Sequence, residues 1–105
     1  MLFTANIFLK GVPSQSPHAK DTVWEERFVL IKANDEEEAM NIAERIGREA
    51  EHNYEAANGV LVFWSYDKVG KIFTVDDEFM HTGTELFSRF LHSTDIDNLF
   101  KPFED

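Results

Sequence analysis

Two extended apolar stretches near the N-terminus predict β-strands. The first, Leu2 to Lys10, is rich in the β-favouring residues Phe, Ile and Thr. The second, Thr22 to Ala33, carries apolar residues at both alternating sets of positions near its end, so we expect both of its faces to be covered there. Between them, Gly11 to His18 contains two prolines and several small polar residues, which predicts a loop.

A helical period follows the second strand and predicts a helix from about Asp35 to about His52. Asn34 is expected to cap its N-terminus, with Glu37 as the capping-box partner. Acidic residues fill the first turn, where the helix dipole favours negative charge. One apolar stripe recurs at three- and four-residue spacing, formed by Ala39, Ile42, Ala43, Ile46 and Ala50.

The β-branched and aromatic run Val60 to Tyr66 predicts a third strand. Asp67 to Lys71 leaves two alternatives open, because a glycine here is typical of both a tight turn and a bulge. The segment is either a turn around Gly70 or a bulge within one long bent strand that continues to Val75. Alternating apolar residues from Thr84 to Leu91 predict the last strand.

The C-terminal tail, Asp95 to Asp105, contains apolar residues around Pro102 and is expected to dock on the protein, with a short helical turn starting at Thr94 or Asp95. Together the elements predict a single α+β domain over residues 1–105, in the order strand-strand-helix-strand-strand. Short connections favour a mainly antiparallel four-stranded sheet with the long helix on one face. One helix cannot cover both faces, so the tail or a second copy of the chain is expected on the other face.

The net charge of the chain limits the classes of molecule that it is expected to bind. The chain has 20 acidic and 10 basic residues and a formal net charge of −10, which repels nucleic acid and anionic membranes and attracts basic proteins. The absence of Cys excludes disulfides, thiolate metal sites and Cys nucleophiles. No stretch approaches the ~20 apolar residues of a membrane-spanning helix, and the N-terminus lacks a signal-peptide pattern, so a cytoplasmic protein is expected.

Several short motifs occur in one order along the chain: Trp24-Glu25-Glu26, Phe28-Val29-Leu30-Ile31-Lys32-Ala33, Asp35-Glu36-Glu37-Glu38-Ala39, a Trp-containing strand, Thr82-Gly83-Thr84-Glu85 and Phe87-Ser88-Arg89-Phe90-Leu91. From about Thr22 to His92 the chain resembles a family of small bacterial proteins described only as a domain of unknown function. The resemblance implies a bacterial single-domain α+β protein and no reaction. It gives no role to the matching residues Trp24, Glu25, Glu26, Ser88 and Arg89.

Two Glu-x-x-His spacings, Glu49 with His52 and Glu78 with His81, match the spacing that di-iron carboxylate proteins use on helices. Those metal sites are built inside four-helix bundles, whereas this chain is predicted to have one long helix. We therefore interpret the four residues as surface residues, and we expect no metal and no other cofactor.

Two groups of neighbouring carboxylates are the candidates for acid–base catalysis: Glu25-Glu26 and Asp76-Asp77-Glu78. Adjacent residues on a strand point to opposite faces, which separates Glu25 from Glu26. The serines lack the Gly-x-Ser-x-Gly setting of an activated nucleophile, and the glycines form no phosphate-binding loop. The expectation is a protein without enzymatic activity.

The remaining signal is the acidic face of the predicted helix. Acidic surfaces accelerate association with basic proteins, and exposed aromatic residues anchor interfaces. We therefore expect a binding module for a basic protein, in its most specific form an inhibitor or immunity protein for a basic effector such as a nuclease toxin. The residues expected to bind the partner are Glu36, Glu37, Glu38, Glu44, Glu51, Tyr54 and Trp24.

Two alternatives remain open. One is a structural or regulatory homo-oligomer, such as a homodimer, that uses the second sheet face as its interface. The other is an enzyme with an unrecognised site. In the homo-oligomer the contact would include Phe8, Phe90, Phe100 and Phe103.

Overall fold

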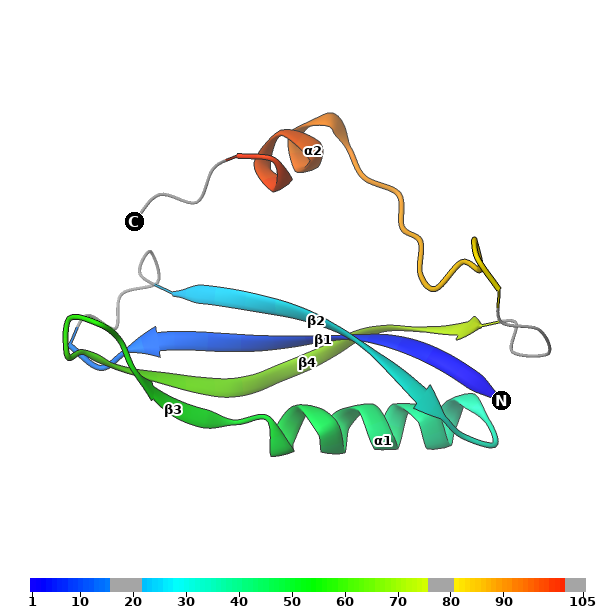
Figure 1. The fold of residues 1–105 in the computed structure, drawn as a ribbon, viewed down its shortest axis with the longest axis horizontal. Helices are drawn as coiled ribbons and strands as arrows, with labels where there is room; N and C mark the ends of the chain where they lie inside the picture. The colour runs from blue at the N-terminus through cyan, green and yellow to red at the C-terminus, as the bar shows by residue number, and fades with distance from the viewer. Residues whose placement is uncertain (16–21, 76–80, 102–105) are drawn as a thin grey trace.

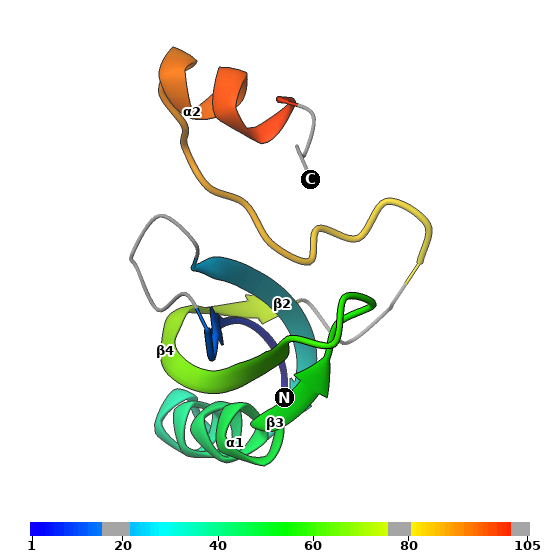
Figure 2. The ribbon, with the colours of Figure 1, turned by 90° about the vertical axis from the view of Figure 1, so that its left-hand side faces the viewer.

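Within the described residues of this computed structural model, 1–15, 22–75 and 81–101, four antiparallel strands pair in the order β2-β1-β4-β3 (Figures 1 and 2). The sheet is strongly curled; α1 packs along one of its faces, and α2 stands away from the other (Figure 2). The protein is therefore an α+β protein, as predicted. Its elements are β1 (Leu2–Pro13), β2 (Val23–Lys32), α1 (Glu36–Glu49), β3 (His52–Glu55), β4 (Leu61–Val75) and α2 (Ser93–Leu99).

The central strand, β1, carries most of the core because it pairs with β2 on one side and with β4 on the other. Every residue from Phe3 to Ile7 is buried. Ile7 faces α1, so the alternation of side chains places Thr4 and Asn6 on the opposite face, which we call the second face. β1 continues past the predicted end at Lys10, and the loop predicted from Gly11 begins only after Pro13.

One long bent strand, β4, continues to Val75, which confirms the bulge alternative and excludes the tight turn. Its register against β1 shifts twice, leaving Asp67 and Gly70 unmatched to any residue of β1. Such bulges bend a strand and increase its twist. Gly70 also leaves room for its neighbours, because a Cβ there would lie 2.7 Å from both Asn6 Oδ1 and Phe8 Cε2.

The N-terminal cap of α1 is Asp35 and not Asn34. The Asp35 carboxylate accepts a hydrogen bond from the Glu38 main-chain amide at 2.8 Å. The Asn34 side chain instead donates to the Glu38 carboxylate at 3.1 Å. The predicted box of Asn34 with Glu37 is therefore wrong by one residue, because Asp35 has the extended backbone that a cap requires.

Gly47 allows α1 to lie close against β4. A Cβ at this position would lie 3.1 Å from Ile7 Cγ2, 2.7 Å from Tyr66 Cε1, and closer still to Tyr66 Cδ1. The Tyr66 ring therefore occupies the space that a side chain at position 47 would need. The Arg48 guanidinium also lies over this ring, 5.0 Å from the ring centroid.

The fourth strand is β3, and the prediction of a strand from Thr84 to Leu91 is wrong. β3 follows α1 at once, since the helix ends at Glu49 rather than near His52. It pairs with the start of β4, and all four of its side chains are exposed. Residues 84–91 join no ladder and run as an extended segment over the second face (Figure 1).

The predicted short helical turn of the tail is present as α2, beginning at Ser93. The His92 main-chain amide donates to the Asp95 carboxylate at 3.0 Å, which closes its first turn. No residue of α2 is buried, and the helix does not pack on the sheet (Figures 1 and 2). The predicted docking is therefore wrong for α2, while residues 102–105, Phe103 included, lie outside the described residues. No helix in the described ranges is long and apolar enough to cross a membrane.

Candidate binding surfaces

Residues 84–89, here called the strap, cover part of the second face. The Thr4 hydroxyl donates a hydrogen bond to the Leu86 carbonyl oxygen. The Phe87 ring packs edge-on against Phe28 of β2 and Phe73 of β4, with centroid distances of 5.0 and 6.3 Å. Edge-to-face aromatic pairs add about 0.5–1.5 kcal/mol beyond the area they bury. The strap is thus held by side-chain contacts and not by strand pairing.

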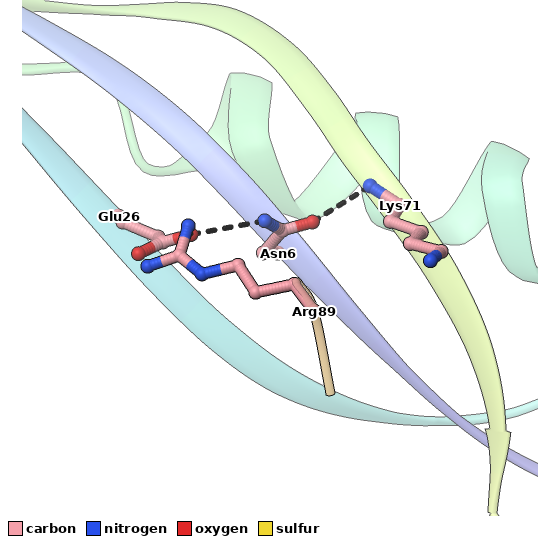
Figure 3. A network of polar contacts seen from close by, with 4 residues as sticks. All are labelled: Asn6, Glu26, Lys71 and Arg89. Carbon is pink, nitrogen blue, oxygen red and sulfur yellow. Dashed lines mark hydrogen bonds and ion pairs between the residues drawn. The ribbon is translucent and has the colours of Figure 1, made fainter. Parts of the chain in front are cut away.

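A polar network joins the strap to three strands (Figure 3). Asn6 Nδ2 donates to Glu26 Oε2 at 3.0 Å, and the Arg89 guanidinium lies 3.2 Å from the same oxygen. Asn6 Oδ1 accepts from the main-chain amide of Lys71 at 2.6 Å. That amide lies next to the bulge at Gly70, so Asn6 satisfies a main-chain donor at the point where the ladder is interrupted.

The network gives a place to two residues that had no role from the sequence, Glu26 and Arg89, and leaves Trp24, Glu25 and Ser88 outside it. The Glu26 carboxylate lies between two donors, Asn6 and Arg89, and this arrangement fixes the strap on the sheet. Among the described residues, every buried polar side-chain atom has a hydrogen-bond partner. The network therefore leaves no buried polar side-chain atom unsatisfied in this part of the chain, as a structural network would.

A pocket of about 550 Å³ opens between the strap and β2. Its walls include Phe28, Leu30, Leu86 and Phe87, and Glu85 is the ionisable residue among its described lining residues. General acid–base chemistry requires proton-transferring groups that converge on one substrate atom. A mostly apolar wall with a single carboxylate fits the burial of an apolar group better than catalysis.

The opposite side of the molecule concentrates negative charge. Residues 35–55 carry eight carboxylates and two arginines, whereas the other described residues carry six carboxylates and seven lysines and arginines. None of the eight is buried. We call this surface, on α1, its cap and β3, the acidic side; its carboxylates are Asp35, Glu36, Glu37, Glu38, Glu44, Glu49, Glu51 and Glu55.

The acidic side holds all five of the glutamates expected to bind a partner, but only one of the two aromatic residues. Glu51 also has a structural contact, since its carboxylate accepts from the Tyr66 main-chain amide at 2.9 Å. Tyr54 is 52% exposed on β3, and its register with β4 places it on the sheet face that α1 covers. Trp24 lies on the second face, where Lys10 sits 5.6 Å from its ring centroid. Trp24 therefore lies on the sheet face opposite the one that α1 covers.

The two Glu-x-x-His spacings do not form metal sites in the described residues. Glu49 ends α1 and His52 begins β3, so the pair lacks the helical geometry that would direct both side chains to one ion. The His52 ring instead stacks on Trp64, with centroids 6.4 Å apart. His81 lies in a turn, and Glu78 is outside the described residues. No group of three potential ligands is found in the part of the chain that the structure describes.

The neighbouring carboxylates Glu25 and Glu26 point to different partners, in agreement with the alternation of a strand. Glu25 pairs with the Arg27 guanidinium at 2.8 Å, while Glu26 belongs to the polar network. They form no common site. The other candidate group, residues 76–78, lies outside the described residues.

Sequence reasoning missed the attachment of the strap. A signal for it exists in β1, where Thr4 and Asn6 are the polar residues of an otherwise apolar stretch and are two positions apart. That spacing places both on one face of a strand. Two polar groups on one face of a central strand indicate that something polar crosses that face.

Comparison with known proteins identifies the family but no activity. No curated protein and no solved structure matches the chain. The family model of a domain of unknown function, DUF4288, matches residues 3–88. The match begins earlier than the resemblance noted from Thr22 to His92. It includes α1 and every strand except the first residue of β1, but neither Arg89 nor α2. Because the match covers most of the chain, the protein belongs to the DUF4288 family of domains of unknown function.

Proposed function

We propose that the protein is a non-enzymatic binding module that holds a basic protein against its acidic side. The observation that carries the proposal is the segregation of charge: eight carboxylates and two arginines lie in residues 35–55, against a near balance in the other described residues. A surface of one sign steers a partner of the opposite sign and also orients it. Net charge spread evenly over the molecule would not orient a partner.

The local structure supports this use of the acidic side. α1 is capped by Asp35 and packed tightly on β4 through Gly47, so its carboxylates are displayed on a fixed element. Tyr54, about half exposed beside them, is the type of residue that anchors interfaces. In its most specific form, the partner is a basic effector protein that the acidic side occludes, as an inhibitor or immunity protein would.

Two variants of equal net charge distinguish the contribution of the acidic side to binding from that of the overall net charge. The first, Glu36→Lys/Glu37→Lys/Glu44→Lys, changes the acidic side but spares Glu38 and Glu51, which make hydrogen bonds within the chain. The control, Asp67→Lys/Glu85→Lys/Asp97→Lys, adds the same charge outside residues 35–55.

The three proteins are immobilised and used to capture proteins from an extract of the native host, and each captured basic protein is then titrated directly. The proposal predicts a basic protein that binds the unmodified chain and the control with similar affinity. It should bind the acidic-side variant at least tenfold more weakly, a difference of about 1.4 kcal/mol. Equal weakening by both variants would show that only net charge matters, and capture of no basic protein would overturn the proposal.

A further inference from the structure

We propose that a second copy of this chain covers the apolar surface on the second-face side of the sheet, with α2 of each protomer lying over β2 of its partner. This inference goes beyond the proposed function, because it concerns the surface opposite the acidic side. The surface joins the outward residues of β2, namely Trp24, Phe28 and Leu30, to those of α2, namely Ile96, Leu99 and Phe100.

The first observation concerns α2, none of whose residues is buried. Ile96, Leu99 and Phe100 follow one another at the spacing that places side chains on one side of a helix, and they are 41%, 55% and 81% exposed. A helix of seven residues is too short to be stable alone in water. The helix stands away from its own sheet (Figures 1 and 2), so its apolar side chains are free to pack against the sheet of a second copy.

β2 supplies an apolar stripe of matching character. Trp24, Phe28 and Leu30 lie on the second face, with Glu26 between the first two, and are 51%, 49% and 55% exposed. The strap covers only part of this face, through the contact of Phe87 with Phe28. Both stripes belong to one chain and lie on the same side of its sheet. A two-fold axis can therefore place the α2 stripe of each protomer against the β2 stripe of its partner.

The exposed area is sufficient for such a dimer. A folded monomer of 12.2 kDa is expected to expose about 6,100 Å², whereas this chain exposes 7912 Å². Its radius of gyration is 16.3 Å, against about 13 Å for a compact domain of this length. The excess of about 1,800 Å², taken over the whole molecule, can accommodate the roughly 1,000 Å² that each partner contributes to a small obligate dimer interface.

The charges also favour a second copy over a strongly charged partner. The described residues outside 35–55 carry nearly balanced charge, with Lys71 and Arg89 on the second-face side, Glu85 on the strap, and Asp95 of α2 lining a pocket together with Arg89. A contact through this side leaves the two acidic sides on opposite outer surfaces, where their repulsion is weakest. A contact through α1 would bring them together.

The oligomeric state of the full chain is the first test. Light scattering at 10–100 µM protein, on the order of a weak dimer's dissociation constant, should give a mass of about 24 kDa, twice 12.2 kDa. Leu99→Asp and Phe100→Asp change side chains of this surface that are 55% and 81% exposed, so the protomer fold should survive. Each should raise the dimer dissociation constant at least tenfold. Tyr54→Asp, at 52% exposure on the other side, should leave the dimer intact.

The chain has no cysteine, so introduced cysteines can locate the contact without background. When the Leu99→Cys and Phe28→Cys proteins are mixed with diamide as oxidant, the disulfide-linked pair is expected, whereas Leu99→Cys with Tyr54→Cys should give none. A monomer at the highest concentration, a dimer that only Tyr54→Asp disrupts, or a dimer without the Leu99–Phe28 link would overturn the proposal. Capture of a basic protein by Leu99→Asp and Phe100→Asp should be unchanged, which keeps this test separate from that of the proposed function.

Discussion

Arg89 and Glu26 are 63 positions apart in the sequence, yet the Arg89 guanidinium lies 3.2 Å from the Glu26 carboxylate. The same carboxylate oxygen accepts a hydrogen bond from Asn6 on the neighbouring strand. The strap is thereby tied to the centre of the sheet by one shared acceptor. Because the Arg89 and Glu26 side chains are partly exposed, their ion pair alone contributes only about 0–1 kcal/mol, and the buried Asn6 is the more important member.

Replacing Asn6 by Asp should therefore be strongly destabilising. The substitution removes the donor to Glu26 and places a second carboxylate beside it on a buried strand. We expect a loss of about 2–4 kcal/mol in the free energy of unfolding, measured by urea denaturation at pH 7. Asn53→Asp, the same chemical change on the exposed strand β3, should stay within about 0.5 kcal/mol. Equal losses in the two variants would contradict the role given to Asn6.

The anchoring of the strap can be tested at Phe87. Phe87→Ala removes both edge-on contacts, to Phe28 and Phe73, and should cost about 2 kcal/mol. It should also expose the apolar second face, which an increase in binding of an apolar dye would detect. Phe63→Ala, a Phe of β4 that is 43% exposed, is the control and should cost less than half as much. Similar losses and dye binding in both would show that the strap is not held by Phe87.

Gly47→Ala should destabilise the protein although Ala favours helices by up to about 1 kcal/mol over Gly. The added methyl group would meet the Tyr66 ring below van der Waals distance, and overpacking of this kind costs about 1–3 kcal/mol. Thermal and urea unfolding measure the balance. Asn41→Ala, at an exposed position of the same helix, should stabilise by a few tenths of a kcal/mol. A stabilised Gly47→Ala variant would mean that α1 is not tightly packed there.

The cap of α1 distinguishes two neighbouring residues. Asp35→Ala removes the acceptor of the Glu38 amide and should cost about 1 kcal/mol of unfolding free energy. Asn34→Ala removes only an exposed contact to the Glu38 side chain and should cost less than half of that. Urea denaturation of both variants measures the two losses in unfolding free energy. A larger loss in Asn34→Ala than in Asp35→Ala would identify Asn34 as the cap.

The strongly periodic elements were predictable from the sequence. The apolar runs of β1 and β2 and the helical stripe of α1 follow from the repeat of buried positions, and the acidic run at 35–38 marked the helix start to within one residue. Asn34 and Asp35 are both good caps by composition. Only the backbone conformation decides between them, which is why the cap was misplaced.

β3 and the strap were not predictable for two different reasons. None of the side chains of His52-Asn53-Tyr54-Glu55 is buried. Its pairing with β4 therefore produces no alternation of apolar and polar residues in the sequence from which a strand could be predicted. Residues 84–91 have the alternation of a strand, with Leu86 and Phe90 on one parity, yet the strap is held by contacts across a sheet face. Alternation reports which side chains face one way and not whether the backbone joins a ladder.

The candidate site was predictable only in part. The clustering of glutamates on α1 follows from the helix prediction, and the structure places all five expected glutamates on one side. Trp24 could not be placed from local sequence, because its face depends on which side of the sheet α1 occupies. That choice is a property of the whole fold.

The central claim, that the acidic side holds a basic protein, is tested most directly by hydrogen exchange of the full chain with and without the captured basic protein. The predicted result is slower exchange of amides in residues 35–55, with the strap unchanged, and loss of this protection in Glu36→Lys/Glu37→Lys/Glu44→Lys. Protection confined to residues 84–99, with residues 35–55 unchanged, would contradict the claim.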